Sequence, residues 1–412
     1  MPPPSDEIEA LCEQVLRENW REGTRERDGV PFAYTCPSPG HYPWQWYWDS
    51  CFTAIVWRRF DRDRAHRELQ SLLNAQRDDG FIGHTIFWNT PLTGIRRVTY
   101  NVTSADATMT DSIQPPLLAW AWSIAVGDPS GVPGITAHHD WLARRRDLDG
   151  DGLVWIVQPD ESGLDASNQF DPIWGPRAHG LPRFVQLVQR NRRLKYDLKA
   201  VLVSGGPVVA EVATNVLACL SNLALGRPSL TPTLIERCYD ESRGMFMPLV
   251  RPHLHGSNGA RADVPVTWTA LAPLALPDLP ESIGRRLVEE HLLDGKRFWL
   301  PFGPPSVAAD EPSFSLHDEG LLGRRRYWRG PMWVNASWLL WTGMVRLGYT
   351  AEADELVRRV AAAVAASGVR EYYDPYTAAG LGAHDFGWST LVMELVAPDP
   401  SAGSAYLDSV RA

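Results

Sequence analysis

The stretch PMWVNASWLLWTGMVRLGYTAEADELVRRVAAAVAASG, residues 331–368, contains two helical patterns separated by a short turn. Pro331 suits the first turn of a helix, and Gly348 and Gly368 suit the positions just beyond helix ends. Two helices joined by so short a turn run antiparallel and pack against each other. This stretch therefore predicts a helical hairpin.

Helical periodicity of the same kind recurs along the chain, often in consecutive pairs. Convincing strands are few, the best being Gly152–Val157, and no alternation of strand and helix favours a parallel sheet. No linker rich in Pro, Gly or Ser divides the sequence, so we expect a single domain over residues 1–412. The other predicted helices are Ile8–Glu22, Asp49–Arg59, Asp61–Gly80, Ser112–Val126, His139–Arg146, Pro207–Leu225, Val264–Ala275, Ser282–Leu293 and Phe386–Val396.

Paired helices without a linker predict an all-α toroid of about six hairpins, with long loops and a minor β-ribbon. A solenoid is the alternative, but no clear sequence repeat supports it. In a toroid the ends of the inner helices and their loops form a funnel. Aromatic- and acid-rich segments fall on such loops and helix starts throughout the chain, so a central cavity is where they can meet.

Composition excludes several classes of function. The net charge of −9 argues against a nucleic-acid partner, because phosphate binding requires a basic excess. The five cysteines are scattered without CxxC spacing, which indicates thiols in a reducing compartment and neither disulfides nor a metal site. No apolar run approaches membrane-spanning length, so we expect a cytoplasmic protein without a membrane partner. A homo-oligomer is left open.

The 18 tryptophans are unusual, and large flat rings suit the faces of sugars. Cleavage of a glycoside needs two carboxyl groups, one on each side of the bond. Asp165 in ESGLDAS and Glu371 in REYYDPYT come from separate loops and fit this requirement. Asp160, Glu161 and Asp171 compete with Asp165, although capping or ion pairing is the expected role of each.

Four motifs together resemble glycoside hydrolase family 63, and most closely its bacterial branch of mannosylglycerate and glucosylglycerate hydrolases. They are QPP at 114–116, ESGLDAS at 161–167, YWRGPMWVNASW at 327–338 and EYYDPYTAAGLGAHDFGWST at 371–390, and the resemblance extends from about Tyr42 to about Val396.

The resemblance implies an (α/α)6 barrel that hydrolyses α-glycosides with inversion, without a metal or other cofactor. It aligns Asp165 with the general acid and Glu371 with the general base. An inverting enzyme holds these carboxyl groups about 6.5–9.5 Å apart, which leaves room for a water molecule. The expected substrate is mannosylglycerate or glucosylglycerate, cleaved to the hexose and D-glycerate.

A bound hexose needs polar partners for its hydroxyls and a flat surface for stacking. Trp46 and Trp48 are expected to line the sugar site. Asp49, which follows them, is expected to bind hydroxyls, with helix capping as its alternative role. His84 and Gln114 are further candidates, and for His84 a structural role competes. Arg329 is expected to hold Glu371 in its charged state, unless it is a surface arginine. Further sugar-binding candidates, with core packing as their alternative, are Tyr42, Trp88, Trp333 and Trp388.

A glycerate aglycone carries a carboxylate, which calls for an arginine assisted by a tyrosine. The basic segment QRNRRLKYD supplies Arg190 and Tyr196, and the resemblance places an Arg and a Tyr of the glycerate site in this region. A solvated basic helix face is the alternative. His384 is another candidate for contact with the aglycone.

Two loops and one turn complete the expectations. The loops Tyr34–Trp44 and Pro301–Gly320 are rich in Pro and Gly, and one or both are expected to act as lids. The turn DLDGDG, Asp147–Gly152, fits only the first half of a calcium loop, so we expect an acidic turn and treat a bound cation as the lesser alternative.

Three rival functions are open. A trehalase-like hydrolase of a neutral disaccharide would share the toroid and the acids. A sugar-binding module without activity is the second rival. A toroid that cyclises isoprenoids is the third, and the absence of a DDxxD cluster argues against it.

Overall fold

The computed structural model describes residues 5–90, 108–175, 181–254, 259–317 and 326–397. The hairpin predicted at residues 331–368 is confirmed as α13 (Val334–Arg346) and α14 (Thr350–Ser367), which pack against each other. Pro331 was predicted to lie in the first turn of this helix, but it lies before α13. The reason is that Met332 forms a two-way backbone bridge with Tyr373, at 2.8 and 2.9 Å, which keeps this segment extended.

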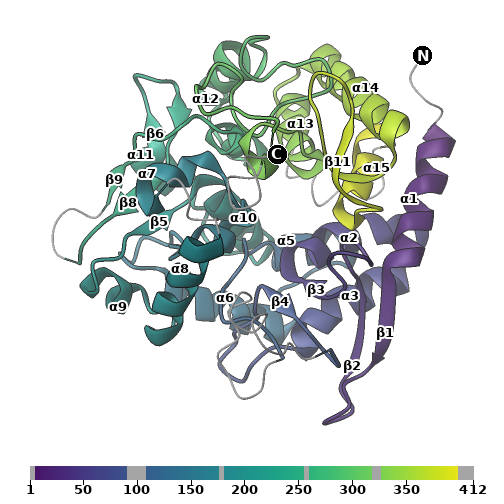
Figure 1. The fold of residues 1–412 in the computed structure, drawn as a ribbon, viewed down its shortest axis with the longest axis vertical. Coiled ribbons are helices and arrows are strands. Elements are labelled where there is room, and N and C mark those ends of the chain that lie inside the picture. Colours follow the sequence, from purple (N-terminus) through teal and green to yellow (C-terminus); the bar gives the residue numbers. More distant parts are fainter. Residues whose placement is uncertain (1–4, 91–107, 176–180, 255–258, 318–325, 398–412) are drawn as a thin grey trace.

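Six inner segments contact one another in a closed ring, in the order in which they follow along the chain (Figure 1). Each contacts the next, and the sixth contacts the first, so the predicted all-α toroid is confirmed as an (α/α)6 barrel. Two of the six, η3 and η6, are 3₁₀ helices. The inner segments are α2 (Tyr47–Phe60), α5 (Leu118–Ala125), α10 (Val212–Ala224), η3 (Trp268–Ala275), α13 and η6 (Gly387–Leu391).

Outer helices alternate with the inner segments along the sequence. They are α1 (Ser5–Asn19), α3 (Arg62–Asn74), α6 (Pro133–Arg146), α11 (Thr231–Cys238), α12 (Glu281–Arg286) with its π-helical continuation η4 (Leu287–Leu292), and α14.

The remaining helices lie outside this alternation of inner and outer segments. They are η1 (Pro159–Ser162), η2 (Asn168–Phe170), α7 (Asp171–Trp174), α8 (Leu181–Arg193), α9 (Leu198–Val203), η5 (Tyr327–Arg329) and α15 (Val392–Val396).

The ring is closed by a buried ion pair as well as by apolar contacts. Glu394 of α15 accepts hydrogen bonds from Arg58 at 2.7 Å and from Arg59 at 2.6 Å, and both arginines lie on α2. The end of the described chain is thereby fixed to the first inner helix.

Strands are short and pair antiparallel in small sheets at the periphery. The pairs are β1 (Trp20–Thr24) with β2 (Pro31–Thr35), β3 (Gln45–Trp46) with β4 (Thr85–Ile86), β6 (Tyr239–Asp240) with β7 (Met245–Phe246), and β10 (Arg370–Tyr373) with β11 (Gly380–His384), while β8 (Leu249–Arg251) lies between β5 (Val208–Ala210) and β9 (Ala260–Arg261).

Two predicted elements are wrong for one shared reason. The helix predicted from Pro207 begins at Val212, and the strand predicted over Gly152–Val157 is not a regular strand. Ile156 and Val209 instead form an isolated antiparallel bridge, with backbone bonds of 2.8 and 3.0 Å. Pairing between distant segments thus overrode the local helical preference of residues 208–210.

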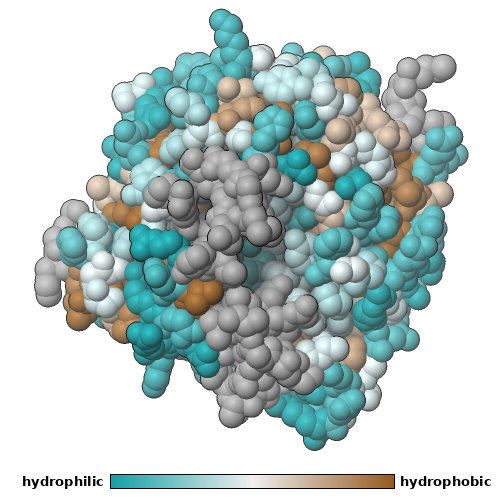
Figure 2. Space-filling view, viewed as in Figure 1, coloured by the Kyte–Doolittle hydropathy of each residue, from teal (hydrophilic) through white to brown (hydrophobic). Residues whose placement is uncertain are grey.

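The surface in Figure 2 is largely hydrophilic, with a recess near the centre of this face. Among the described residues, the structure contains no helix with the length and apolar character needed to cross a bilayer.

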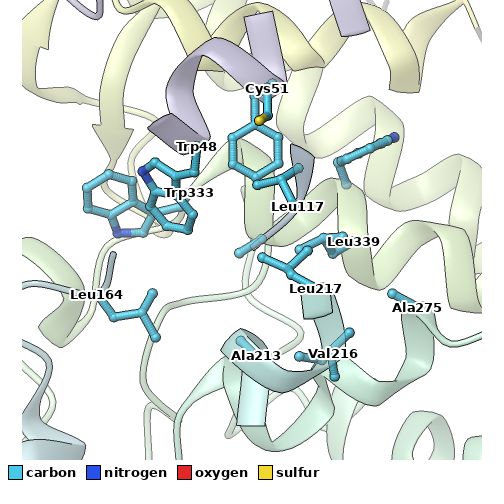
Figure 3. Packing of buried hydrophobic residues seen from close by; sticks show 14 of the residues in the cluster. Trp48, Cys51, Leu117, Leu164, Ala213, Val216, Leu217, Ala275, Trp333 and Leu339 are labelled. Atoms are coloured by element: carbon cyan, nitrogen blue, oxygen red, sulfur yellow. The ribbon is translucent and has the colours of Figure 1, made fainter. Parts of the chain in front are cut away.

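Apolar side chains of the inner segments fill the interior of the ring (Figure 3). Cys51, Leu117, Leu217, Ala275 and Leu339 come from or adjoin five different inner segments and are all buried. Burial of a large aliphatic side chain stabilises a fold by roughly 1.5–3 kcal/mol. This shared core holds the inner segments in fixed positions, and so fixes the loops that precede them.

Candidate active site

The N-terminal ends of several inner segments carry the chemical groups of the site. Asp49 lies in the first turn of α2, Gln114 lies four residues before α5, and Trp388 lies in η6. Glu371 lies on β10, which bridges to the segment before α13. The ring therefore gathers groups from distant parts of the sequence at one end.

Glu371 is buried and held by three hydrogen-bond donors. Its Oε1 accepts from the Tyr327 hydroxyl at 2.9 Å, its Oε2 accepts from the Ala383 backbone N–H at 2.9 Å, and Tyr42 also donates to it. Burial raises the pKa of Glu371 to about 7, and the negative charge of Asp165 adds to the rise while the three donors oppose it. Glu371 is therefore divided between its two protonation states near neutral pH.

Gly382 is required beside this carboxylate. A Cβ at this position would lie 2.4 Å from Glu371 Oε2, and the backbone φ of +68° is one that other residues rarely adopt. The close approach of the backbone is what allows the neighbouring Ala383 N–H to reach the carboxylate.

The acids that compete with Asp165 have structural partners. Glu161 is fully buried and forms a bidentate ion pair with Arg146, at 2.5 and 2.9 Å. Asp171 pairs with Arg329 at 2.6 Å. Glu161 and Asp171 therefore form ion pairs, one of the roles expected for them.

Asp160 is different, because it lies within the site. Its Oδ2 accepts from Gln158 at 2.9 Å and lies 3.9 Å from His84 Nδ1. Burial raises the pKa of Asp160 well above its ordinary value, and the nearby charge of Asp165 adds to that effect. From the sequence, only a capping or pairing role is expected for Asp160.

Asp165 lies between two residues with left-handed backbone conformations. Gly163 has φ +70° and Ala166 has φ +61°. A Cβ on Gly163 would lie 2.6 Å from the ring of Trp48, so the loop rests directly on that ring. The charge of Asp165 acts on both Asp49 and Glu371, which places all three carboxyl groups in one electrostatic environment.

Arg329 does not hold Glu371, contrary to the prediction. Its Nη1 donates to the Ala166 carbonyl at 2.9 Å and to Asp171 at 3.2 Å, and its Nη2 donates to Asp171 at 2.6 Å. The guanidinium is buried, so its charge is matched by the carboxylate in contact with it. Arg329 thus binds the loop that carries Asp165.

The residues predicted to bind a hexose fall into two groups. Burial raises the pKa of Asp49 well above its ordinary value, with the negative charges of Glu371 and Asp165 among the added causes. Burial lowers the pKa of His84 to about 3, so its ring is neutral, and it meets Trp46 edge-on at 5.0 Å. Gln114 Oε1 accepts from the Trp48 backbone N–H at 2.9 Å. These residues surround the carboxyl groups.

The second group occupies positions that favour packing. Trp333 has 0% exposure and lies against Trp328, with ring centroids 3.8 Å apart, and against Tyr372 at 4.7 Å. Trp88 stacks on Phe32 at 4.8 Å. Protein rings already cover these two indoles.

The remaining aromatic candidates lie beside the site. Trp388 meets Trp48 edge-on at 5.2 Å and is buried. Tyr42 is half-buried, meets Trp46 edge-on at 5.8 Å, and reaches Glu371 as described above.

Arg190 and Tyr196, the residues predicted to bind the aglycone, lie on α8 and just after it. Tyr196 is buried, and its hydroxyl has no hydrogen-bond partner among the described residues. Burial raises the pKa of Tyr196 well above its ordinary value, and the charges of Asp160 and Glu161 contribute, so the phenol lies near the acid loop.

Arg190 is half-buried and lines a cavity of about 290 Å³ together with Trp174 and Arg183. Its Nε donates to Asn191 at 2.9 Å. His384, the other aglycone candidate, is exposed at the end of β11. The basic segment is therefore not simply a solvated face, because Arg190 and Tyr196 are both partly or wholly enclosed.

The acidic turn Asp147–Gly152 is neutralised by protein cations. Asp149 accepts from Arg237 at 3.2 Å and from Arg251, and Asp151 accepts from Arg237. The described part of the chain contains no cluster of side chains suited to a metal ion. The carboxylates of Asp149 and Asp151 therefore have guanidinium partners.

Sequence reasoning missed Tyr327 and Gly382. Tyr327 belongs to the quoted YWRG motif, but nothing in the motif distinguishes its hydroxyl from those of neighbouring tyrosines. Gly382 could have been suspected, since it stands inside the quoted motif at 371–390 and a glycine there suggests close backbone approach.

Comparisons with known proteins agree with this geometry. Residues 42–389 match the model of the mannosylglycerate hydrolase MGH1-like glycoside hydrolase domain. A mannosylglycerate hydrolase of Thermus thermophilus is 29% identical over 87% of this chain and 95% of its own. A glucosylglycerate hydrolase of Mycolicibacterium hassiacum is 26% identical over 86% of this chain and 92% of its own. The structure of a Thermus thermophilus GH63 mannosylglycerate hydrolase in complex with Tris and D-glycerate superposes with a TM-score of 0.76 at 25% identity, covering 94% and 99% of the two chains.

Proposed function

Because this chain belongs to the family of mannosylglycerate hydrolase MGH1-like glycoside hydrolase domains, we propose that it hydrolyses mannosylglycerate, glucosylglycerate or both. The products are the free hexose and D-glycerate, with inversion at the anomeric carbon. Relatives of nearly the same length bear both names, which supports this substrate class.

Two carboxyl groups carry out the reaction in this proposal. Asp165 protonates the glycosidic oxygen, and Glu371 takes a proton from the water that attacks the opposite face of the sugar. The observation that supports the assignment best is the environment of Glu371, which has a pKa of about 7 and feels the charge of Asp165. A general base works best when its pKa lies near the working pH. The separation of about 6.5–9.5 Å expected for inversion stays a prediction.

The hexose would lie between these acids. Asp49 and His84 supply polar partners for its hydroxyls, and Trp46 supplies an aromatic wall. The side-chain carbonyl of Gln114 accepts a hydrogen bond from the Trp48 backbone N–H. No hydrogen bond joins the amide nitrogen of Gln114 to the other described residues, so this nitrogen can donate to the sugar.

The glycerate carboxylate would be received by Tyr196 and Arg190. The Tyr196 hydroxyl is buried and lacks a partner among the described residues, so an entering carboxylate would satisfy it. Arg190 supplies the positive charge, and partial burial lowers its pKa. The proposed substrate is thus a small anionic glycoside. The cytoplasmic location of the protein stays a prediction, as does the closing of the Tyr34–Trp44 loop over the site. Part of the second predicted lid, Pro301–Gly320, lies outside the described residues.

Direct assay of the released sugar tests the proposal. The purified protein is incubated with mannosylglycerate, glucosylglycerate and trehalose, and proton NMR follows the first anomer released. Rapid appearance of the β-anomer from a glycerate-bearing substrate is the expected result. Turnover of trehalose alone would support the trehalase-like alternative, and no turnover of any substrate would support a sugar-binding protein.

A further inference from the structure

Ala166 has an unusual backbone conformation at a sensitive place. Its φ of +61° lies in the left-handed region, which costs an L-residue with a side chain free energy relative to the right-handed form. It directly follows Asp165, so the direction of the Asp165 side chain depends on this conformation. Some interaction must hold Ala166 there, since alanine does not favour it.

Arg329 supplies that interaction. Its Nη1 donates to the Ala166 carbonyl at 2.9 Å, and the same guanidinium is fixed by two bonds to Asp171, at 3.2 and 2.6 Å. Arg329 is 3% exposed, so water does not compete effectively for the carbonyl. The three residues come from the acid loop, from η5 and from the start of α7.

The other side of the loop is fixed by contact. Gly163 packs directly against the Trp48 ring, so the loop cannot shift toward α2. The segment that carries Asp165 is therefore in contact with Trp48 on one side and with Arg329 on the other.

We propose that Arg329 is a positioning residue for the general acid: by holding Ala166 in its left-handed conformation, it directs Asp165 toward the glycosidic oxygen. This inference rests on the proposed function of Asp165. It assigns Arg329 a role that differs from the stabilisation of Glu371 predicted from the sequence.

Two substrates separate loss of acid positioning from general damage. Departure of glycerate from its glycoside needs a proton, whereas fluoride departs from α-mannosyl fluoride without one. For Arg329→Gln, kcat on mannosylglycerate should fall at least about thirtyfold, which is part of the roughly 10²–10⁴-fold that a general acid contributes, with KM changed less than about threefold. Hydrolysis of the fluoride should fall much less.

The matched control is Arg58→Gln, which removes a guanidinium from a buried ion pair with Glu394 remote from the acid loop. It should affect both substrates equally. The double variant Arg329→Gln/Ala166→Gly tests the backbone argument, because glycine adopts positive φ without strain. Its kcat on mannosylglycerate should exceed that of Arg329→Gln by at least about threefold.

The inference is overturned if Arg329→Gln slows both substrates by the same factor, or if Ala166→Gly fails to raise the activity of that variant. Circular dichroism of each protein confirms that it is folded before the comparison. Failure of the proposed function looks different, since the wild-type protein itself would then leave both glycerate-bearing substrates intact.

Discussion

Replacement of Tyr327 by phenylalanine should move the acidic limb of the pH profile upward. The Tyr327 hydroxyl donates to Glu371 Oε1 at 2.9 Å and favours the charged carboxylate. A hydrogen bond to a charged group contributes roughly 1.5–3 kcal/mol. At about 1.4 kcal/mol per pKa unit, its loss raises the pKa of Glu371 by about one unit or more. The donors Tyr42 and Ala383 remain, so we take the smaller value, from about 7 to roughly 8.

The sign follows from the role of the base. Glu371 must be deprotonated to activate water, so a higher pKa removes active enzyme at low pH and spares it at high pH. With the pKa one unit higher, kcat/KM should fall about tenfold at pH 6 and about fivefold at pH 7. The assay is kcat/KM for mannosylglycerate between pH 5 and pH 9.

Tyr373→Phe provides the control, because the Tyr373 hydroxyl donates to the Gly368 carbonyl at 2.8 Å and accepts from the Arg370 backbone N–H at 2.8 Å. Removal of the Tyr373 hydroxyl should leave the pH dependence of kcat/KM unchanged. An acidic limb in Tyr327→Phe that coincides with that of the wild-type protein would refute the reasoning, as would an equal shift in both variants.

Three further changes test other parts of the site. Asp165→Asn should lower kcat on mannosylglycerate by about 10²–10⁴ while calorimetry still detects substrate binding, and retained turnover would reassign the acid. Arg190→Ala should raise KM for glycerate-bearing substrates by about tenfold or more and leave α-mannosyl fluoride unaffected, whereas equal effects would remove Arg190 from the aglycone site. Glu161→Gln breaks the buried pair with Arg146 and should lower the free energy of unfolding by about 3–5 kcal/mol, so an unchanged denaturation midpoint would count against a structural role for this pair.

Sequence pattern predicted the helical parts of the ring well, because an apolar stripe of helical period records which face is buried. It failed where the backbone bonds with a distant segment. Residues 208–210 look helical locally, yet Val209 pairs with Ile156. The inner segments η3 and η6 were also predicted as ordinary helices, since side-chain periodicity over so few residues hardly separates a 3₁₀ helix from an α-helix.

In the site, too, some features were predicted from the sequence and others were not. Asp165 and Glu371 were selected from their residue type, their loops and the family resemblance. Pairings could not be predicted, because several carboxylates compete for each arginine and only the fold decides between them. Arg329 therefore was assigned to Glu371, although it bonds Asp171. Tyr327 was missed because the atom that its hydroxyl reaches lies on a strand far along the chain.

The crowding of Asp49, Asp160, Asp165 and Glu371 has a consequence for the close of each catalytic cycle. In the proposed mechanism Asp165 ends the reaction without its proton, while Glu371 ends it with one taken from water. The number of protons in the chamber is unchanged, but the charge has crossed to the opposite wall. The enzyme must therefore reset before it can accept another substrate, in a chamber where burial and neighbouring negative charge raise the pKa values of Asp49 and Asp160.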